Sequence, residues 1–246
     1  MLSGAGAIKA MDSRTPGSLE KGRVGGLLQS ATYMAGLSGG SWLLGSVVLN
    51  NFTTIEQLQK SGGTWDLENS ILAPGGLKVI TNTKYYKNVM DEVKSKEDAG
   101  FDVSLTDFWG RALSRQFLEF PDGGPGVTFS SIALTDGYKN AGFPFPIIVA
   151  DGRAPGQTII SSNATVFEFN PLEFGSFDPN LFAFTPTQYI GTNMTNGVPV
   201  DQNACAREIL EGRSDKLEDV AFKSGRVKIH EKLVKETGRS AHNKPV

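Results

Sequence analysis

The sequence predicts an α/β fold, in which helices pack against a mixed or parallel sheet. The first observation is a strand, a turn and a helix in succession: the apolar run Leu27–Ala35, a glycine-rich turn, and the apolar helical segment Trp42–Leu49. The second is a pair of later strands, Phe145–Ala150 and Ser162–Phe169, the latter partly alternating. Strands that are separated by helical stretches are typical of α/β proteins.

Helices are expected in the stretches between these strands. Gly4–Met11 consists mainly of small and apolar residues and predicts a short helix, which ends before the turn residues Thr15–Ser18. The polar segment Asn82–Ser95 predicts a surface helix, preceded by a break at Pro74–Gly76. Phe117–Gly126 contains a Pro-Asp-Gly-Gly-Pro sequence and predicts a turn.

The composition is that of a globular protein and excludes several functions. Of 246 residues, 39% are hydrophobic and 20% are charged, which suffices for a buried core. The formal net charge of −2 produces no broad positive field, so no nucleic-acid partner is expected. No apolar stretch approaches the roughly 20 residues that span a bilayer, so no transmembrane segment is expected. Residues Met1–Ile8 lack the basic and apolar regions of a secretory signal.

The sequence lacks the motifs that bind common cofactors and metal ions, so neither is expected. Cys205 is the single cysteine, which excludes an intrachain disulfide and a zinc site built from cysteines. The sequence has no P-loop, no complete G-x-G-x-x-G and no EF-hand calcium loop. Three N-x-S/T sequons, at Asn51, Asn163 and Asn193, would matter only if the chain enters a secretory lumen.

A change in composition near Cys205 divides the chain into a body, residues 1–205, and a charged tail, residues 206–246. The tail holds 10 Lys and Arg and 7 Asp and Glu residues, whereas the much longer body holds 14 and 19. The tail is net basic and contains both histidines, His230 and His242. We therefore expect a solvated helix with a frayed end there, and not more core.

The segment Gly36–Gly40 matches the G-x-S-x-G nucleophile elbow, with Ser38 at its centre. It follows an apolar strand and precedes an apolar helix, which is the context that an elbow requires. The small residues let neighbouring backbone approach, and the N–H groups of the following helix stabilise a developing oxyanion. We predict that Ser38 is a catalytic nucleophile. The alternative is a glycine-rich turn that only packs a helix on a strand.

A serine nucleophile needs a base, and the body of the chain offers no histidine for that role. Because His230 and His242 lie in the charged tail, a serine activated by a carboxylate is the better model. Asp-Gly pairs occur at Asp122, Asp136 and Asp151, and Asp122 is the best of these candidates. Each pair is also typical of a plain turn.

The aromatic-rich segment Phe167–Pro179 allows two interpretations. It fits a lipid-facing wall, and it also fits a buried core strand. Composition alone favours the core.

Four segments carry motifs that occur together in a known family: Gly36–Trp42, Leu2–Thr15, Asp107–Leu113 and Phe174–Asp178. Together they resemble the fungal-type lysophospholipase/phospholipase B family, which is related to the catalytic domain of cytosolic phospholipase A. The resemblance extends from residue 1 to about Cys205, so the body resembles part of a lysophospholipase catalytic domain.

The resemblance implies an acyl hydrolase that works through a Ser-Asp dyad. In this sequence the matching nucleophile is Ser38, which would attack the carboxyl ester of a glycerophospholipid or lysophospholipid and release a fatty acid. The resemblance further implies a substrate at a peripheral membrane or micelle surface. Members of the family are typically secreted or cell-surface glycoproteins, which would give the sequons a use.

The sequence also departs from the family pattern. In the family, a Gly-rich segment and an arginine precede the stretch that matches Leu2 onward, and the catalytic Asp lies in a later Asp-Gly-Gly loop. Asp122–Gly124 resembles a separate, upstream segment. On this basis we expect an incomplete member that is weakly active or inactive as written. Two alternatives stay open: an inactive lipid- or partner-binding remnant, and a Ser-His hydrolase that uses His230.

Overall fold

The structure is a computed structural model of the 246-residue chain. It describes residues 1–60, 63–76, 78–101, 103–152 and 158–190, together with the backbone of residues 194–195 and 198–199. The chain divides into two compact units, Met1–Ile190 and Gly191–Val246. In the second unit, β6 (Met194–Thr195) pairs antiparallel with β7 (Val198–Pro199). The predicted tail, residues 206–246, lies outside the described residues.

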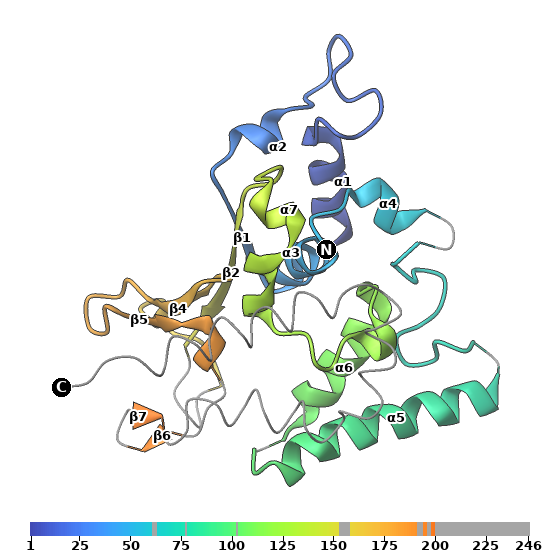
Figure 1. The fold of residues 1–246 in the computed structure, drawn as a ribbon, viewed down its shortest axis with the longest axis vertical. Coiled ribbons are helices and arrows are strands. Elements are labelled where there is room, and N and C mark those ends of the chain that lie inside the picture. Colours follow the sequence, from blue (N-terminus) through green and yellow to red (C-terminus); the bar gives the residue numbers. More distant parts are fainter. Residues whose placement is uncertain are drawn as a thin grey trace, which may run out of the picture. The chain divides into compact units, whose positions relative to one another are not determined.

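A five-stranded mixed sheet forms the framework of the first unit, in the order β1, β2, β3, β4, β5 (Figure 1). The first pair is parallel and the other three pairs are antiparallel. This arrangement confirms the predicted α/β class with a mixed sheet. The strands are β1 (Tyr33–Leu37), β2 (Phe145–Asp151), β3 (Val166–Phe169), β4 (Glu173–Ser176) and β5 (Ala183–Pro186).

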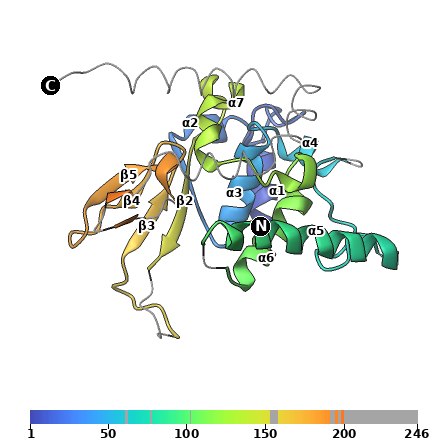
Figure 2. The same cartoon turned by 60° about the horizontal axis from the view of Figure 1, so that its bottom comes forward.

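Helix α3 (Gly39–Leu49) connects directly to β1 and forms the centre of the hydrophobic core. It packs against β1 and β2 and buries Leu43, Leu44, Val47 and Val48. One side of α3 is buried against the sheet and another against neighbouring helices. A helix that is covered on several sides carries few polar residues, as α3 does. Figure 2 shows α3 and α1 beside the β1–β2 end of the sheet, with β3, β4 and β5 extending away from them.

The remaining helices surround this core or lie beside it. Helix α1 packs on α3 and α4, whereas α5 and α6 pack on each other. Helix α6 is capped at its N-terminus, where the backbone N–H of Ser104 donates a 2.8 Å hydrogen bond to the carboxylate of Asp107. The helices are α1 (Leu2–Met11), α2 (Leu27–Ser30), α4 (Ile55–Gln59), α5 (Val79–Asp98), α6 (Leu105–Phe117) and α7 (Asp136–Lys139), with short 3-10 turns η1 (Pro121–Gly123), η2 (Phe129–Leu134) and η3 (Thr187–Tyr189).

The predicted strand at Leu27–Ala35 is wrong in its first half. Residues Leu27–Ser30 form α2, and the strand begins only at Tyr33. Gly26, with a φ of 95°, turns the chain before this helix, and Leu28 is buried at 2% exposure. A short apolar run does not distinguish a buried helical turn from a strand, and this ambiguity explains the error.

The other predicted elements are present with shifted bounds. The helix expected at Trp42–Leu49 begins at Gly39, and the one expected at Asn82–Ser95 extends over α5. The helix expected at Gly4–Met11 begins at Leu2. The strand expected at Ser162–Phe169 is shorter, because a turn precedes Val166.

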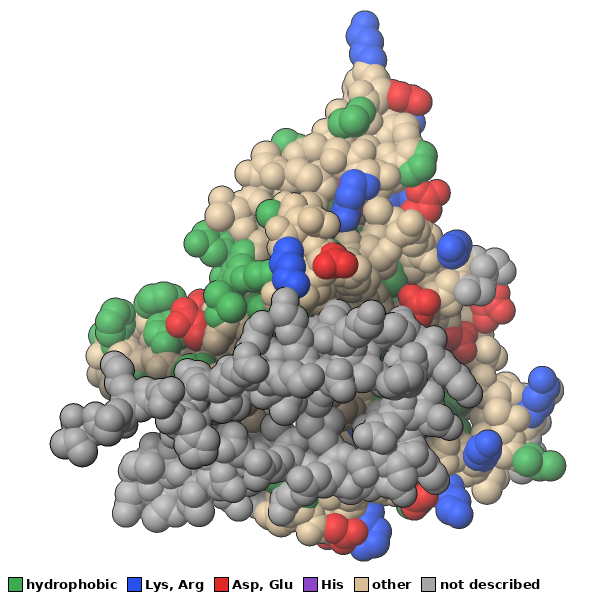
Figure 3. Space-filling model, in the orientation of Figure 1, with side chains coloured by type: hydrophobic (Ala, Val, Ile, Leu, Met, Phe, Trp, Pro, Cys, Tyr) green, Lys and Arg blue, Asp and Glu red, His purple; other side chains and the backbone are tan. Residues whose placement is uncertain are grey.

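The aromatic segment Phe167–Pro179 is not part of the main core, so the core interpretation is wrong for its exposed members. Phe169 and Phe174 stack with ring centroids 4.3 Å apart and are half-buried. Phe177, by contrast, is 64% exposed, and Phe182 in the following loop is 70% exposed. Figure 3 shows hydrophobic side chains gathered over the region of β4 and β5. The sheet continues away from α3 here, and β4 packs against β3, β5 and the 3-10 turn η3.

Candidate active site

Ser38 lies in the sharp turn between β1 and α3, and its backbone is strained. Its φ and ψ angles are 53° and −123°, a combination that glycine adopts readily and other residues rarely. Strain of this kind costs about 1–3 kcal/mol and tends to persist at functional sites, where the surrounding structure holds it. Ser38 is exposed, and its side chain does not cap α3. The hydroxyl is therefore accessible to a ligand from solvent.

Gly36 is needed because β1 and α3 approach each other closely. A Cβ atom on Gly36 would lie 2.7 Å from the carbonyl oxygen of Gly40 and 2.9 Å from the backbone nitrogen of Ser41. The Ser41 hydroxyl donates a 2.7 Å hydrogen bond to the Gly36 carbonyl oxygen, which ties the helix to the strand. At Gly40, a Cβ atom would meet nothing within 4 Å. Packing thus requires the first glycine of the motif and tolerates a side chain at the second.

The first turn of α3 places backbone N–H groups beside the elbow. The Ser38 carbonyl oxygen accepts hydrogen bonds from the N–H groups of Ser41 and Trp42, at 2.9 and 3.3 Å, and so starts the helix. The N–H groups of Gly39 and Gly40 come before the first helical donor, the N–H of Ser41, so helix geometry gives them no acceptor within α3. They carry the positive end of the dipole of an 11-residue helix. This arrangement stabilises negative charge that develops next to Ser38.

An ion pair between Arg14 and the buried carboxylate of Asp12 anchors the far ends of the helices that support the elbow. Asp12 follows α1 and is 1% exposed, and its carboxylate accepts hydrogen bonds from Arg14 Nη2 at 2.7 Å and Gln29 Nε2 at 2.8 Å. Arg14 Nη1 in turn donates to the carbonyl oxygen of Phe52, beyond the end of α3, at 2.8 Å. The pair therefore joins the C-terminal end of α1 to that of α3.

Asp12 is held in its ionised form by these contacts. Burial alone would raise the pKa of the carboxyl, but the hydrogen bonds from Arg14 and Gln29 and the charge of Arg14 outweigh it. The pKa of Asp12 is consequently lowered below its usual value. The ion pair persists through the neutral range.

Asp122 is held in a surface turn by two arginines of α6. Its side chain is 57% exposed, and Oδ1 accepts a 2.9 Å hydrogen bond from Arg115 Nη1. Its carbonyl oxygen accepts another from Arg111 Nη2 at 2.6 Å. Both arginines also bind Glu92 of α5, at 2.7 and 2.5 Å. Within the described residues, no hydrogen bond joins Asp122 to Ser38.

The other two Asp-Gly pairs differ in their position relative to the elbow. Asp136 is exposed at the start of α7, and the N–H of the next residue, Gly137, donates a 2.8 Å hydrogen bond to Asn51 Oδ1, after the end of α3. Asp151 is the last residue of β2 and is also exposed. Leu37 of β1 pairs with Val149 of β2, so Asp151 lies at the carboxyl edge of the sheet where Ser38 lies.

Sequence reasoning missed the anchoring role of Asp12 and Arg14 and the position of Asp151. The first two lie in Leu2–Thr15, a segment that carries the family resemblance and a predicted helix but no local signal for an ion pair. The edge position of Asp151 depends on the pairing of β1 with β2, which are more than one hundred residues apart in sequence. His230 and His242 lie outside the described residues.

The fold and the elbow define an α/β protein with a strained serine between a strand and a helix. The model of the lysophospholipase catalytic domain matches residues 1–211. The chain therefore belongs to the lysophospholipase catalytic domain family, as its sequence motifs predict.

Individual relatives are similar over most of this chain. Lysophospholipase 1 of Aspergillus fumigatus is 52% identical over 212 residues, which is 84% of this chain and 34% of the relative. Lysophospholipase of Penicillium chrysogenum is 50% identical over 212 residues, 84% of this chain and 35% of the relative. Lysophospholipase 1 of Saccharomyces cerevisiae is 50% identical over 210 residues, which is 83% of this chain and 32% of the relative. The chain spans about a third of the length of these curated relatives.

A solved structure shares the fold. Human GIVD cytosolic phospholipase A2 superposes with a TM-score of 0.53 and 17% sequence identity, over 78% of this chain and 24% of that protein. The similarity confirms the α/β architecture related to cytosolic phospholipase A2. In the part of the chain that the structure describes, no helix is both long and apolar enough to cross a membrane.

Proposed function

We propose that this chain carries the nucleophile of a lysophospholipase or phospholipase B, which hydrolyses the carboxyl ester of a lysophospholipid or phospholipid. The observation that carries the proposal is the strained, exposed Ser38 on the turn between β1 and α3. Membership of the lysophospholipase catalytic domain family supports the same substrate class.

The chemistry follows from the position of Ser38. Its Oγ attacks the ester carbonyl carbon while its proton passes to a carboxylate base. The oxyanion that forms accepts hydrogen bonds from the N–H groups at the start of α3, that of Gly39 being the first. The glycerophospho alcohol then leaves with the proton, and the acyl group stays on Ser38. Water attacks this acyl ester and releases the fatty acid.

A carboxylate base, rather than histidine, is part of the proposal. The family resemblance implies a Ser-Asp dyad, with the Asp in an Asp-Gly-Gly loop beyond the matching stretch. Among the Asp-Gly pairs of the described residues, Asp151 has the position that best fits the role, because it shares the sheet edge with Ser38. Asp122 is engaged with Arg115 instead.

The proposal extends to the surroundings of the reaction. A lysophospholipid is presented in micelles or at a membrane surface, and the exposed aromatic rings of the β4–β5 region suit contact with such an aggregate. Secretion or display at the cell surface would place the sequons where they can be glycosylated.

Fatty-acid release from lysophosphatidylcholine by the purified 246-residue chain tests the proposal. A fluorophosphonate probe, which reacts with activated serines, is applied in parallel, and Ser38→Ala serves as the control for both assays. We expect weak but measurable release, and labelling, by the parent chain and neither by Ser38→Ala. Labelling that persists in Ser38→Ala would show that another serine is the nucleophile.

Two further variants identify the base. Asp151→Asn is expected to lower fatty-acid release at least a hundredfold if Asp151 takes the serine proton, by analogy with the loss of other general bases. Asp122→Asn is expected to retain release within a few-fold. Equal activity of Asp151→Asn and the parent would assign the base to another carboxylate.

A further inference from the structure

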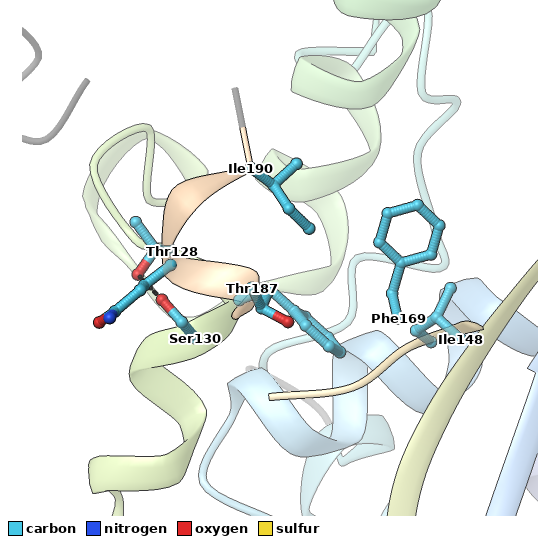
Figure 4. A pocket seen from close by; sticks show the side chains of 8 residues that line it. Thr128, Ser130, Ile148, Phe169, Thr187 and Ile190 are labelled. Carbon is cyan, nitrogen blue, oxygen red and sulfur yellow. Dashed lines mark hydrogen bonds between the residues drawn. The ribbon is translucent and has the colours of Figure 1, made fainter. Parts of the chain in front are cut away.

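A cavity of about 490 Å³ lies between the sheet and the 3-10 turns η2 and η3. Figure 4 shows Ile148 and Phe169 on one side of it and Ile190, from the end of η3, on the other. Phe129 of η2 is the fourth apolar side chain of the lining. All eight lining residues are uncharged. The volume is in the range of pockets that bind small organic ligands.

The polar groups of the lining are largely bonded to protein atoms. The Thr187 hydroxyl donates to the Asn170 carbonyl oxygen at 2.7 Å and is buried. The hydroxyls of Thr128 and Ser130 bind each other at 3.1 Å (Figure 4). A ligand gains little from hydrogen bonds to groups that already have partners, so the cavity favours an apolar ligand.

The register of the sheet places this cavity near Ser38. Ile148 pairs with Gly36, and in a parallel pair both residues face the same side of the sheet, which is the side that α3 covers. From strand spacing and residue rise, the Cα atom of Ile148 is about 8 Å from that of Ser38. Phe169 pairs with Ile148 and continues the same face one strand further.

We infer that this cavity binds the fatty-acyl chain of the substrate whose ester reacts at Ser38. The inference rests on the proposed function and adds a subsite to it. A long acyl chain extends well beyond 8 Å from its carbonyl carbon, so its distal part reaches Ile148, Phe169 and Ile190. A zwitterionic headgroup does not fit there, because the lining offers no charge to pair with it.

Filling the cavity tests the assignment. The variants Ile190→Trp and Ser130→Phe each add an aromatic ring to the cavity, from two different sides. If one variant does not fold, the other still tests the assignment. We expect KM for palmitoyl lysophosphatidylcholine to rise about tenfold, or about 1.4 kcal/mol, with hexanoyl hydrolysis within about twofold of the parent. Ile159→Trp is the matched control, because Ile159 is 81% exposed and does not line the cavity. Thermal unfolding verifies that each variant is folded.

The outcomes separate this inference from the proposed function. Hydrolysis whose chain-length dependence is unchanged in both filling variants would overturn the cavity assignment and leave the function intact. If the parent hydrolyses neither ester, the cavity is judged by binding to the Ser38→Ala chain. Calorimetry with hexadecylphosphocholine and hexylphosphocholine, each below its micelle concentration, should then show at least tenfold tighter binding of the longer probe. Ile190→Trp should abolish that difference, and equal affinities in the starting chain would refute the assignment.

Discussion

Gly36 and Gly40 approach so closely that a Cβ atom on Gly36 would lie 2.7 Å from the Gly40 carbonyl oxygen. The contact crosses the elbow, since Gly36 is in β1 and Gly40 in the first turn of α3. It forces the chain to reverse sharply at Ser38. The strained backbone of the serine is therefore a consequence of how strand and helix pack.

Gly36→Ala is expected to destabilise the chain by about 1–3 kcal/mol, because the methyl group meets backbone atoms that cannot turn away. Gly40→Ala is the matched control: its Cβ meets nothing within 4 Å, so the unfolding free energy should change little or increase by up to about 1 kcal/mol. Urea unfolding monitored by tryptophan fluorescence measures both. Equal destabilisation by the two variants would contradict the packing argument.

Ser38→Gly should be more stable than Ser38→Ala. Glycine adopts a φ of 53° without steric cost, whereas alanine retains the strain, so we expect a difference of about 1 kcal/mol in unfolding free energy. Both variants remove the hydroxyl and should release no fatty acid. If Ser38→Gly is the less stable of the two, the strain at this position is not significant.

Acidification should destabilise the chain through Asp12. The pKa of Asp12 is lowered in the folded state, so its contribution is present above the unfolded-state pKa and is lost as the pH falls through the folded pKa, below 3.8. Asp12→Asn should lose about 2 kcal/mol at neutral pH, because the hydrogen bonds to a charged carboxylate are weakened.

The pH dependence distinguishes Asp12 from exposed carboxylates. Thermal unfolding between neutral pH and about pH 3 should show a smaller acid effect in Asp12→Asn than in the parent. Asp136→Asn, which changes an exposed residue, should follow the parent curve. Identical acid sensitivity of Asp12→Asn and the parent would assign the effect to other groups.

Asn163 should carry a glycan in preference to Asn51 when the chain is expressed in a secretory host. Asn163 is exposed in the loop before β3. Its side chain accepts a hydrogen bond from Ser161, two residues away in the same loop. The Asn51 side chain, although also exposed, accepts a 2.8 Å hydrogen bond from the N–H of Gly137 in α7, and this long-range contact restricts its access to a transferase. In gel electrophoresis, Asn163→Gln should lower the apparent mass of the protein by one glycan, and Asn51→Gln should leave the apparent mass unchanged. A lower apparent mass in Asn51→Gln alone would contradict this assignment.

The fold class and the helix after the elbow could be predicted because they depend on local patterns. The apolar segment Trp42–Leu49 and the glycines before it determine where α3 lies, to within three residues of its observed start. The interval Leu27–Ala35 could not be divided correctly, because both α2 and β1 bury apolar side chains and a nine-residue run contains too few turns to reveal a period.

The amino-acid sequence by itself determined the identity of the serine in the elbow, the scarcity of histidine and the membership of a lysophospholipase family, because each depends on which residues are adjacent in the chain. Tertiary structure alone decided which distant groups meet: Asp12 with Gln29, Ile148 with Gly36, and Asp122 with Arg115 rather than with Ser38. Strand register and helix packing set those distances, and both result from contacts between segments that are far apart in the sequence.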